Sequence, residues 1–162
     1  MRYAVIMFLL IFICQNPSNA QKLQADSLLG ESPGPFLALS VAHLDTMVAW
    51  YRDNLGFTVY SSGTTETGIQ AALLLRGNAL IELLQIPLAR PRTTAAPGTT
   101  DASQIHGFFK SGFVVRDIDA AYRRALMIPH SLAYKLVKPS TGPYRTFGVK
   151  DPEGNLIQFF GL

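Results

Sequence analysis

The larger apolar side chains of residues 37–41 recur at every second position, which is the period of a β-strand. Leu37, Leu39 and Val41 fall on one face, while the opposite face is also largely apolar. A strand with two apolar faces is expected to be covered on both sides. This segment therefore predicts a buried strand at the start of a domain.

From Asp45 onward the apolar positions recur at helical spacing. The larger apolar side chains of this segment are Met47, Trp50, Tyr51 and Leu55. Asp45 or Thr46 can cap the first turn, and Gly56 supplies the left-handed residue that ends many helices. The pattern predicts an amphipathic helix that ends at this glycine.

Three further strand-like runs follow at residues 57–61, 68–75 and 79–85. The segment 86–107 is instead rich in proline, alanine, threonine and glycine and has little hydrophobic content, which is typical of a mobile connector or lid. The first half of the chain is thus predicted to contain a strand, a helix and three strands.

The second half repeats this order. A strand is predicted at 112–115, Asp117 opens a short amphipathic helix, and three strand-like runs follow at 132–137, 145–149 and 156–160. Repetition of the same element order predicts an internal duplication.

The first 20 residues have the pattern of a signal peptide. Arg2 precedes an apolar run at residues 3–14, and Ser18 and Ala20 supply the small residues expected before a cleavage site. The run is shorter than the roughly 20 residues of a membrane-spanning helix. We expect cleavage after Ala20, a periplasmic or secreted mature protein that no longer contacts the membrane, and a flexible tether at 21–35.

Composition excludes some kinds of chemistry. Cys14, the single cysteine, falls inside the predicted leader, so neither a disulfide nor a cysteine nucleophile is expected in the mature chain. The sequence has 14 basic and 11 acidic residues and no basic cluster, which gives no support for nucleic-acid binding.

Several motifs carry a family resemblance. The two halves open with related segments at 41–45 (VAHLD) and 115–119 (VRDID), the first helix ends in WYRDNLGF at 50–57, and the chain closes with FGVKDPEGNLIQF at 147–159. These segments resemble the glyoxalase, bleomycin-resistance and extradiol-dioxygenase superfamily, also called the vicinal oxygen chelate superfamily, over residues 36–162.

The resemblance implies an α+β fold. Two βαβββ modules, residues 36–85 and 108–162, are expected to form a curved mixed sheet around a cleft. The 151–155 segment (DPEGN) is expected to make a tight turn, with Gly154 adopting a positive φ. In this family a metal ion binds residues of the first and fourth strands of each module.

Most of the positions that match the family's metal ligands lack a good donor. Phe36 and Lys110 stand at the first-strand positions, and Glu82 and Gln158 at the fourth-strand positions. One carboxylate and one amide hold a divalent ion weakly. No cofactor is therefore predicted and the metal site is interpreted as degenerate, although a divalent metal remains an open alternative.

The cleft is expected to be partly apolar. Its predicted wall contains Phe36, Ala38, Val114, Leu156 and Phe160, with Glu82, Lys110 and Gln158 as polar groups. The charges of Glu82 and Lys110 either face a ligand or neutralise each other, within one chain or across a homodimer.

Residues outside the cleft are expected to have structural roles. We expect the three histidines, His43, His106 and His130, to be surface or turn residues. Tyr144 is expected to pack across strands, and Arg145 to have neither a packing role nor a ligand contact.

Three functions are compatible with this sequence. The first is metal-independent binding of a small, partly apolar ligand, as in the bleomycin-resistance branch that the chain resembles. The second is a lyase, isomerase or dioxygenase in which Glu82 serves as catalytic base or ligand and a metal or Lys110 acts as electrophile. The third is an interaction module that uses the connector as its contact surface.

Overall fold

The computed structural model describes residues 34–99, 103, 107–140 and 142–162. The chain divides into two units, residues 1–33 and 34–162, and only the second is described below. The predicted signal peptide and most of the predicted tether lie outside the described residues. The described part of the chain contains no helix long and apolar enough to cross a membrane.

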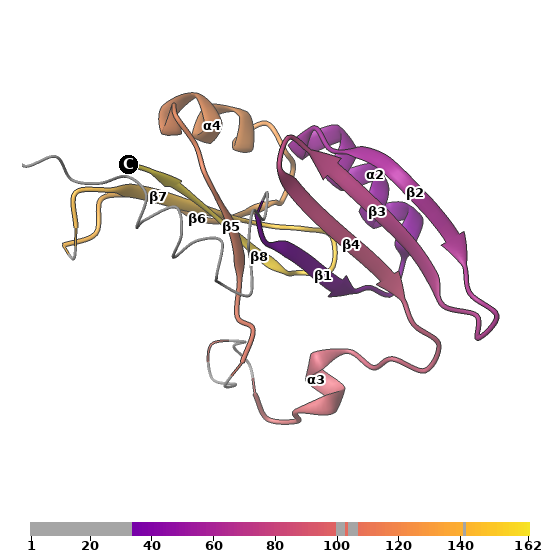
Figure 1. Cartoon of the computed structure of the whole chain (residues 1–162). Helices are drawn as coiled ribbons and strands as arrows, with labels where there is room; N and C mark the ends of the chain where they lie inside the picture. The colour runs from indigo at the N-terminus through magenta and orange to yellow at the C-terminus, as the bar shows by residue number, and fades with distance from the viewer. Residues whose placement is uncertain (1–33, 100–102, 104–106, 141) are drawn as a thin grey trace, which may run out of the picture. The chain divides into compact units, whose positions relative to one another are not determined.

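The first module contains one helix and one four-stranded sheet (Figure 1). Its elements are β1 (Phe36–Ser40), α2 (Leu44–Leu55), β2 (Thr58–Thr64), β3 (Gln70–Arg76) and β4 (Ala79–Gln85). The strand order is β1-β4-β3-β2, with β1 parallel to β4 and the other pairs antiparallel. We call this sheet A.

The second module repeats this arrangement. Its elements are β5 (Ser111–Val114), α4 (Ile118–Ala125), β6 (Leu132–Val137), β7 (Arg145–Lys150) and β8 (Leu156–Gly161). The order β5-β8-β7-β6, again with a parallel first pair, defines sheet B. The predicted α+β fold with two βαβββ modules is confirmed, and the predicted connector contains the short helix α3 (Arg92–Ala95).

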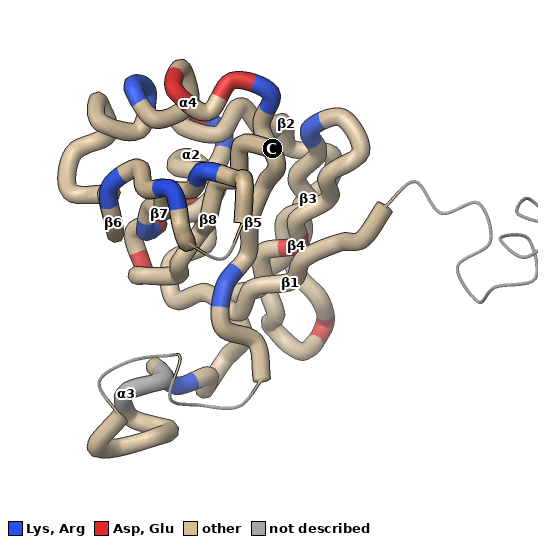
Figure 2. Tube along the Cα trace, turned by 90° about the vertical axis from the view of Figure 1, so that its left-hand side faces the viewer, with Lys and Arg blue, Asp and Glu red and all other residues tan. Residues whose placement is uncertain are grey.

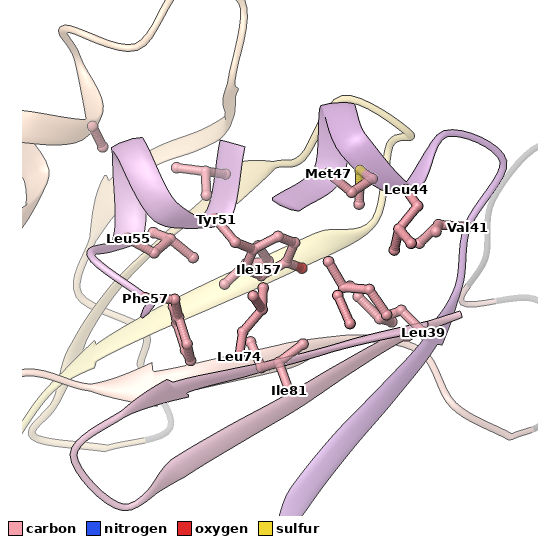
Figure 3. Packing of buried hydrophobic residues seen from close by; sticks show 14 of the residues in the cluster. Leu39, Val41, Leu44, Met47, Tyr51, Leu55, Phe57, Leu74, Ile81 and Ile157 are labelled. Carbon is pink, nitrogen blue, oxygen red and sulfur yellow. The ribbon is translucent and has the colours of Figure 1, made fainter. Parts of the chain in front are cut away.

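One hydrophobic core serves both modules. Met47 and Tyr51 of α2 pack with Leu74 of sheet A and with Ile157 of sheet B (Figure 3). Aromatic contacts continue this core into the second module through Phe57, Phe113, Phe159 and Phe147, where the last two rings stack at 4.8 Å. Burial of this continuous apolar surface holds the modules together.

Each sheet has a second face that does not belong to the core. On β1 the side chains of Leu39 and Val41 are buried, whereas Phe36 is 64% exposed and Ala38 and Ser40 are also exposed. The prediction that this strand is covered on both sides is therefore wrong, because only the face toward the core is covered. We call the opposite faces of the two sheets the open faces.

The helix α2 begins in a way that the sequence did not indicate. His43 is the N-cap residue and its side chain makes no capping hydrogen bond, so the predicted cap by Asp45 or Thr46 is wrong. The predicted end is confirmed, since Gly56 adopts φ 70°. By contrast, α4 is capped by Asp117, whose carboxylate accepts a hydrogen bond from the Ala120 N–H at 2.9 Å.

Candidate functional site

A groove of about 1440 Å³ lies between the two modules and the start of the connector. It is lined by parts of β1, β4, β6, the connector and the turn between β7 and β8. The lining residues are Leu39, Ser40, Val41, Ala42, His43, Gly68, Gln70, Gln85, Ile86, Pro87, Leu88, Ala89, Arg90, Pro91, Phe108, Phe109, Ser111, Ala133, Tyr134, Lys150, Glu153, Gly154, Asn155 and Leu156. Apolar and polar groups contribute to this lining in similar measure.

One wall of the groove contains the N-terminus of α2. A carboxylate of the second module accepts hydrogen bonds from the backbone N–H groups at this helix start. Glu153 Oε1 accepts hydrogen bonds from the N–H groups of Ala42 at 2.8 Å and His43 at 2.9 Å. Gln85 Oε1 accepts from the N–H of Leu44 at 2.9 Å. Because unpaired N–H groups at a helix start attract negative charge, Glu153 supplies the cap that α2 lacks in its own sequence.

The turn that carries Glu153 is built around a buried aspartate. Asp151 Oδ1 accepts from the N–H groups of Glu153 at 3.0 Å and Asn155 at 2.9 Å, and Gly154 has φ 83° as predicted. Asp151 Oδ2 accepts from the hydroxyl of Tyr51 in α2 at 3.4 Å. The Asp151 carboxylate therefore positions the Glu153 turn against the first module.

Burial affects the protonation of this pair. Removal from solvent raises the pKa of Asp151, while hydrogen bonds from Asn155, Glu153 and Tyr51 act in the opposite direction. The pKa of Tyr51 is raised well above its usual value, first by burial and then by the neighbouring Asp151 carboxylate. Tyr51 is consequently a neutral hydrogen-bond donor in the folded protein.

The open face of sheet A carries Glu82. Its strand neighbours in register are Ala38 on β1 and Leu73 on β3, and its side chain is half-buried. Sheet A carries few charges. Among the residues of its four strands, Arg76 at the end of β3 is the other charged residue (Figure 2).

The open face of sheet B carries a connected polar group. Gln158 pairs in register with Gly112 and Gly148, and only 7% of its surface is exposed. Its Nε2 donates to Thr146 Oγ1 at 2.7 Å, and Thr146 Oγ1 lies 3.0 Å from the Tyr134 hydroxyl. Gln158 Oε1 is buried and has no hydrogen-bond partner among the residues that the structure describes.

Comparison with known proteins agrees with this architecture. A model of the Glyoxalase/Bleomycin resistance protein/Dioxygenase superfamily matches residues 35–159. The chain belongs to this superfamily. The resemblance seen in the sequence is thereby confirmed, whereas no curated protein sequence matches the chain.

Solved structures show the same superfamily fold at low identity. A glyoxalase family protein from Enterococcus faecalis is 16% identical, with 78% of this chain and 93% of that chain covered and a TM-score of 0.63. TioX from Micromonospora sp. ML1 is 20% identical, with 80% and 95% covered and a TM-score of 0.54. TnmS3, an antibiotic binding protein from Streptomyces sp. CB03234, is 18% identical, with 76% and 90% covered and a TM-score of 0.52.

The family's metal positions do not form a metal site in this chain. The position next to Glu82 on β1 is Ala38, and the position next to Gln158 on β5 is Gly112, so neither fourth-strand donor has a donor beside it in register. In the described part of the chain, no three His, Cys, Asp or Glu side chains gather in a group that could hold a metal ion. The donor set therefore does not fit the family's metal ion.

The predicted cleft residues divide between the two open faces. Phe36, Ala38 and Glu82 share sheet A, whereas Val114, Leu156, Gln158 and Phe160 share sheet B. Of the predicted set, Leu156 lines the groove. Lys110 precedes β5 and its ammonium lies 5.4 Å from the Phe109 ring centroid. Glu82 and Lys110 form no ion pair in the described region.

Other predicted side chains are also placed. His43 and His130 are exposed, and His106 lies outside the described residues. Tyr144 packs on Phe160 with a centroid distance of 5.4 Å, as predicted. Arg145 forms an ion pair with Asp119 that joins β7 to α4, a contact that the sequence interpretation did not include.

The sequence interpretation missed three groove or network residues. Tyr134, Thr146 and Glu153 were not assigned to a site, although Glu153 lies within the turn motif. A usable signal was Gly148 between Phe147 and Val149, because a glycine inside a strand marks the close approach of another group. That group is the Tyr134 ring, which a Cβ at position 148 would overlap.

Proposed function

We propose that this protein binds a small, partly apolar ligand in the groove without a metal ion. The observation that carries the proposal is the groove of about 1440 Å³ between the modules, where apolar residues such as Ile86, Phe108 and Leu156 and polar residues contribute to the lining in similar measure. A site of this composition can contact the apolar part of a ligand and form hydrogen bonds with its polar part.

At least one residue of each open face lines this groove. Ser40 lines it and lies on the same face of β1 as Ala38, the register partner of Glu82. Leu156 lines it and lies on the same face of β8 as Gln158. We include the other residues predicted from the sequence as cleft walls in the proposed site because they lie on these same two faces.

Metal-independent binding agrees with the donor set. Glu82 and Gln158 are the two oxygen donors at the family's ligand positions, and they lie on different sheets with Ala38 and Gly112 as neighbours. A divalent ion bound there would lack the three or four protein donors that tight sites use. TnmS3, which is an antibiotic binding protein, shows that the same fold hosts binding of small organic molecules.

Export is part of the proposal. The leader pattern at residues 1–20 supports removal of a signal peptide and action in the periplasm or outside the cell. Amino-terminal sequencing of the protein recovered from a cell fraction tests this directly. A mature chain that begins at Gln21 is expected, and a cytoplasmic chain that begins at Met1 would contradict export.

The binding test uses 2-acetylnaphthalene, an apolar molecule with one carbonyl oxygen. We expect saturable binding in titrations followed by NMR, and we expect Ala133→Trp to weaken it at least about tenfold because the new ring fills the groove. Leu126→Trp, at an exposed position outside the groove, is the matched control and should bind as the wild type does.

Elemental analysis of the purified protein tests the metal-free part of the proposal. We expect less than stoichiometric zinc, nickel, manganese or iron after incubation with each ion. Retention of one metal ion per chain that Glu82→Ala abolishes would overturn metal-independent binding, and absence of any saturable probe binding would overturn the binding function.

A further inference from the structure

Three side chains of sheet B form a chain of hydrogen bonds on the open face. Gln158 on β8 donates from Nε2 to Thr146 Oγ1 on β7 at 2.7 Å, and Thr146 Oγ1 lies 3.0 Å from the hydroxyl of Tyr134 on β6. The glutamine and the threonine are buried, with 7% and 4% of their surfaces exposed. Tyr134 is half-buried and lines the groove.

The direction of these hydrogen bonds follows from the need of each buried donor and acceptor for a partner. A threonine hydroxyl has one proton to donate, and Thr146 Oγ1 already accepts from Gln158. If Tyr134 donated to Thr146, the buried Thr146 proton would have no acceptor among the contacts recorded for the described residues. A buried unpaired donor is costly, so Thr146 donates to the Tyr134 oxygen.

The orientation of the Gln158 amide supports the same direction. As placed, the amino group donates to Thr146 and the oxygen Oε1 is left without a partner. In this orientation the oxygen and one N–H lack a partner among the described residues, whereas the reverse orientation would leave both N–H donors of the amino group unpaired. Gln158 therefore acts as donor at the buried end of the chain.

The consequence is a phenol proton that no described contact takes up, on a residue that lines the groove. Since the Tyr134 oxygen accepts from Thr146, its own proton is available to a group outside the protein. A tyrosine phenol is protonated at neutral pH, and partial burial raises the pKa of Tyr134 further. The absence of a Cβ at Gly148 lets the Tyr134 ring lie across β7 with its hydroxyl at Thr146.

We infer that the Tyr134 hydroxyl is the hydrogen-bond donor that recognises an acceptor oxygen of the ligand, with Thr146 and Gln158 fixing the direction of that donor. The ligand class is thereby narrowed to partly apolar molecules that carry a hydrogen-bond acceptor, such as a carbonyl or carboxylate oxygen. This inference rests on the proposed binding function. Thr146 and Gln158 are positioning residues, because they act through Tyr134.

Two matched probes separate the hydrogen bond from apolar burial. In 2-acetylnaphthalene the carbonyl oxygen accepts a hydrogen bond, and in 2-isopropenylnaphthalene a CH₂ group of similar shape replaces that oxygen. We expect the full-length protein to bind the ketone about five to ten times more tightly, the ratio expected for one hydrogen bond. The ¹³C resonance of the bound ketone carbonyl should move downfield.

Three variants locate the effect. Tyr134→Phe should remove the preference for the ketone and the carbonyl shift while the alkene still binds. Thr146→Val keeps the phenol but removes its orienting partner, so an intermediate preference is expected. Tyr60→Phe, at a tyrosine that is 70% exposed on β2, is the matched control and should retain the full preference.

The outcomes test the role of Tyr134 and the binding function separately. Equal binding of both probes by the wild type, or a ketone preference that survives Tyr134→Phe, overturns the role of Tyr134 and leaves groove binding intact. Absence of saturable binding for both probes overturns the binding function itself. If Tyr134→Phe does not fold, Thr146→Val provides the decision, because a full ketone preference in that variant would contradict a donor oriented by Thr146.

Discussion

The two modules share one topology but differ in the burial and the side-chain hydrogen bonds of their sheets. Both have a parallel pair of first and fourth strands and the same strand order. In sheet A, every residue of β2 is exposed and Glu82 stands among apolar neighbours, whereas in sheet B four successive residues of β7 are buried and Thr146 links two polar side chains. Duplication therefore accounts for the framework, while the chain of hydrogen bonds through Thr146 lies in the second module.

The modules also differ in how their helices are capped. The second module caps α4 with its own Asp117, whereas the first relies on Glu153 of the second module. The first module therefore depends on the second for the cap of its helix α2. The three predictions below test this dependence, in order of expected effect.

The largest effect is expected from Asp151→Ala. This change leaves the N–H groups of Glu153 and Asn155 and the Tyr51 hydroxyl without their acceptor. We expect the free energy of unfolding in urea to fall by about 3 kcal/mol. Asn78→Ala, in the exposed turn between β3 and β4 of the first module, is the control and should change stability by less than about 0.5 kcal/mol. Equal losses would show that the two turns contribute alike.

Glu153→Ala should have a smaller effect that is specific to the first module. It uncovers the N–H groups of Ala42 and His43, and loss of a helix cap costs about 1 to 2 kcal/mol. Hydrogen exchange should accelerate in the first turn of α2. Asp117→Ala serves as the counterpart, since it should accelerate exchange in α4 alone. Unchanged exchange in α2 would contradict the cross-module cap.

Among the three changes, Tyr51→Phe is expected to alter the free energy of unfolding least at neutral pH. The difference from the wild type should change with pH above pH 10. Burial holds the pKa of Tyr51 above the value of 10.0 that applies when the chain unfolds. The neutral side chain therefore contributes fully below pH 10, and stability falls above it by about 1.4 kcal/mol per pH unit. Urea unfolding between pH 9 and 11 should show a shallower fall for Tyr51→Phe, with Tyr60→Phe as control. Identical slopes would contradict a raised pKa.

Local patterns predicted most of the framework. The strands at 79–85 and 132–137 have the predicted bounds, and Gly56 ends α2 as expected. These features depend on neighbours within a few residues, and the periodicity of side chains records such neighbours directly. The predicted end of β2 was too early, because Ser62 and Gly63 continue to pair with β3 despite their weak strand preference.

The site was harder to predict because its contacts join distant residues. The cap that we assigned to Asp45 is supplied by Glu153, across 111 positions from Ala42. Tyr134, Thr146 and Gln158 meet only because of the register of three strands, and the β6–β7 pairing includes shifts that no local pattern indicates. Residue type identified Gln158 as a candidate, but its partners required the structure.

The contact between Glu153 and Ala42 has a consequence for the order of folding. Within each module, the hairpins β2–β3, β3–β4, β6–β7 and β7–β8 join segments that follow one another along the chain. Closing a loop of about a hundred residues costs more conformational entropy than closing a hairpin. Refolding should therefore produce the hairpins first and dock the halves last. Because the groove exists only between docked halves, ligand binding would report the final step of refolding.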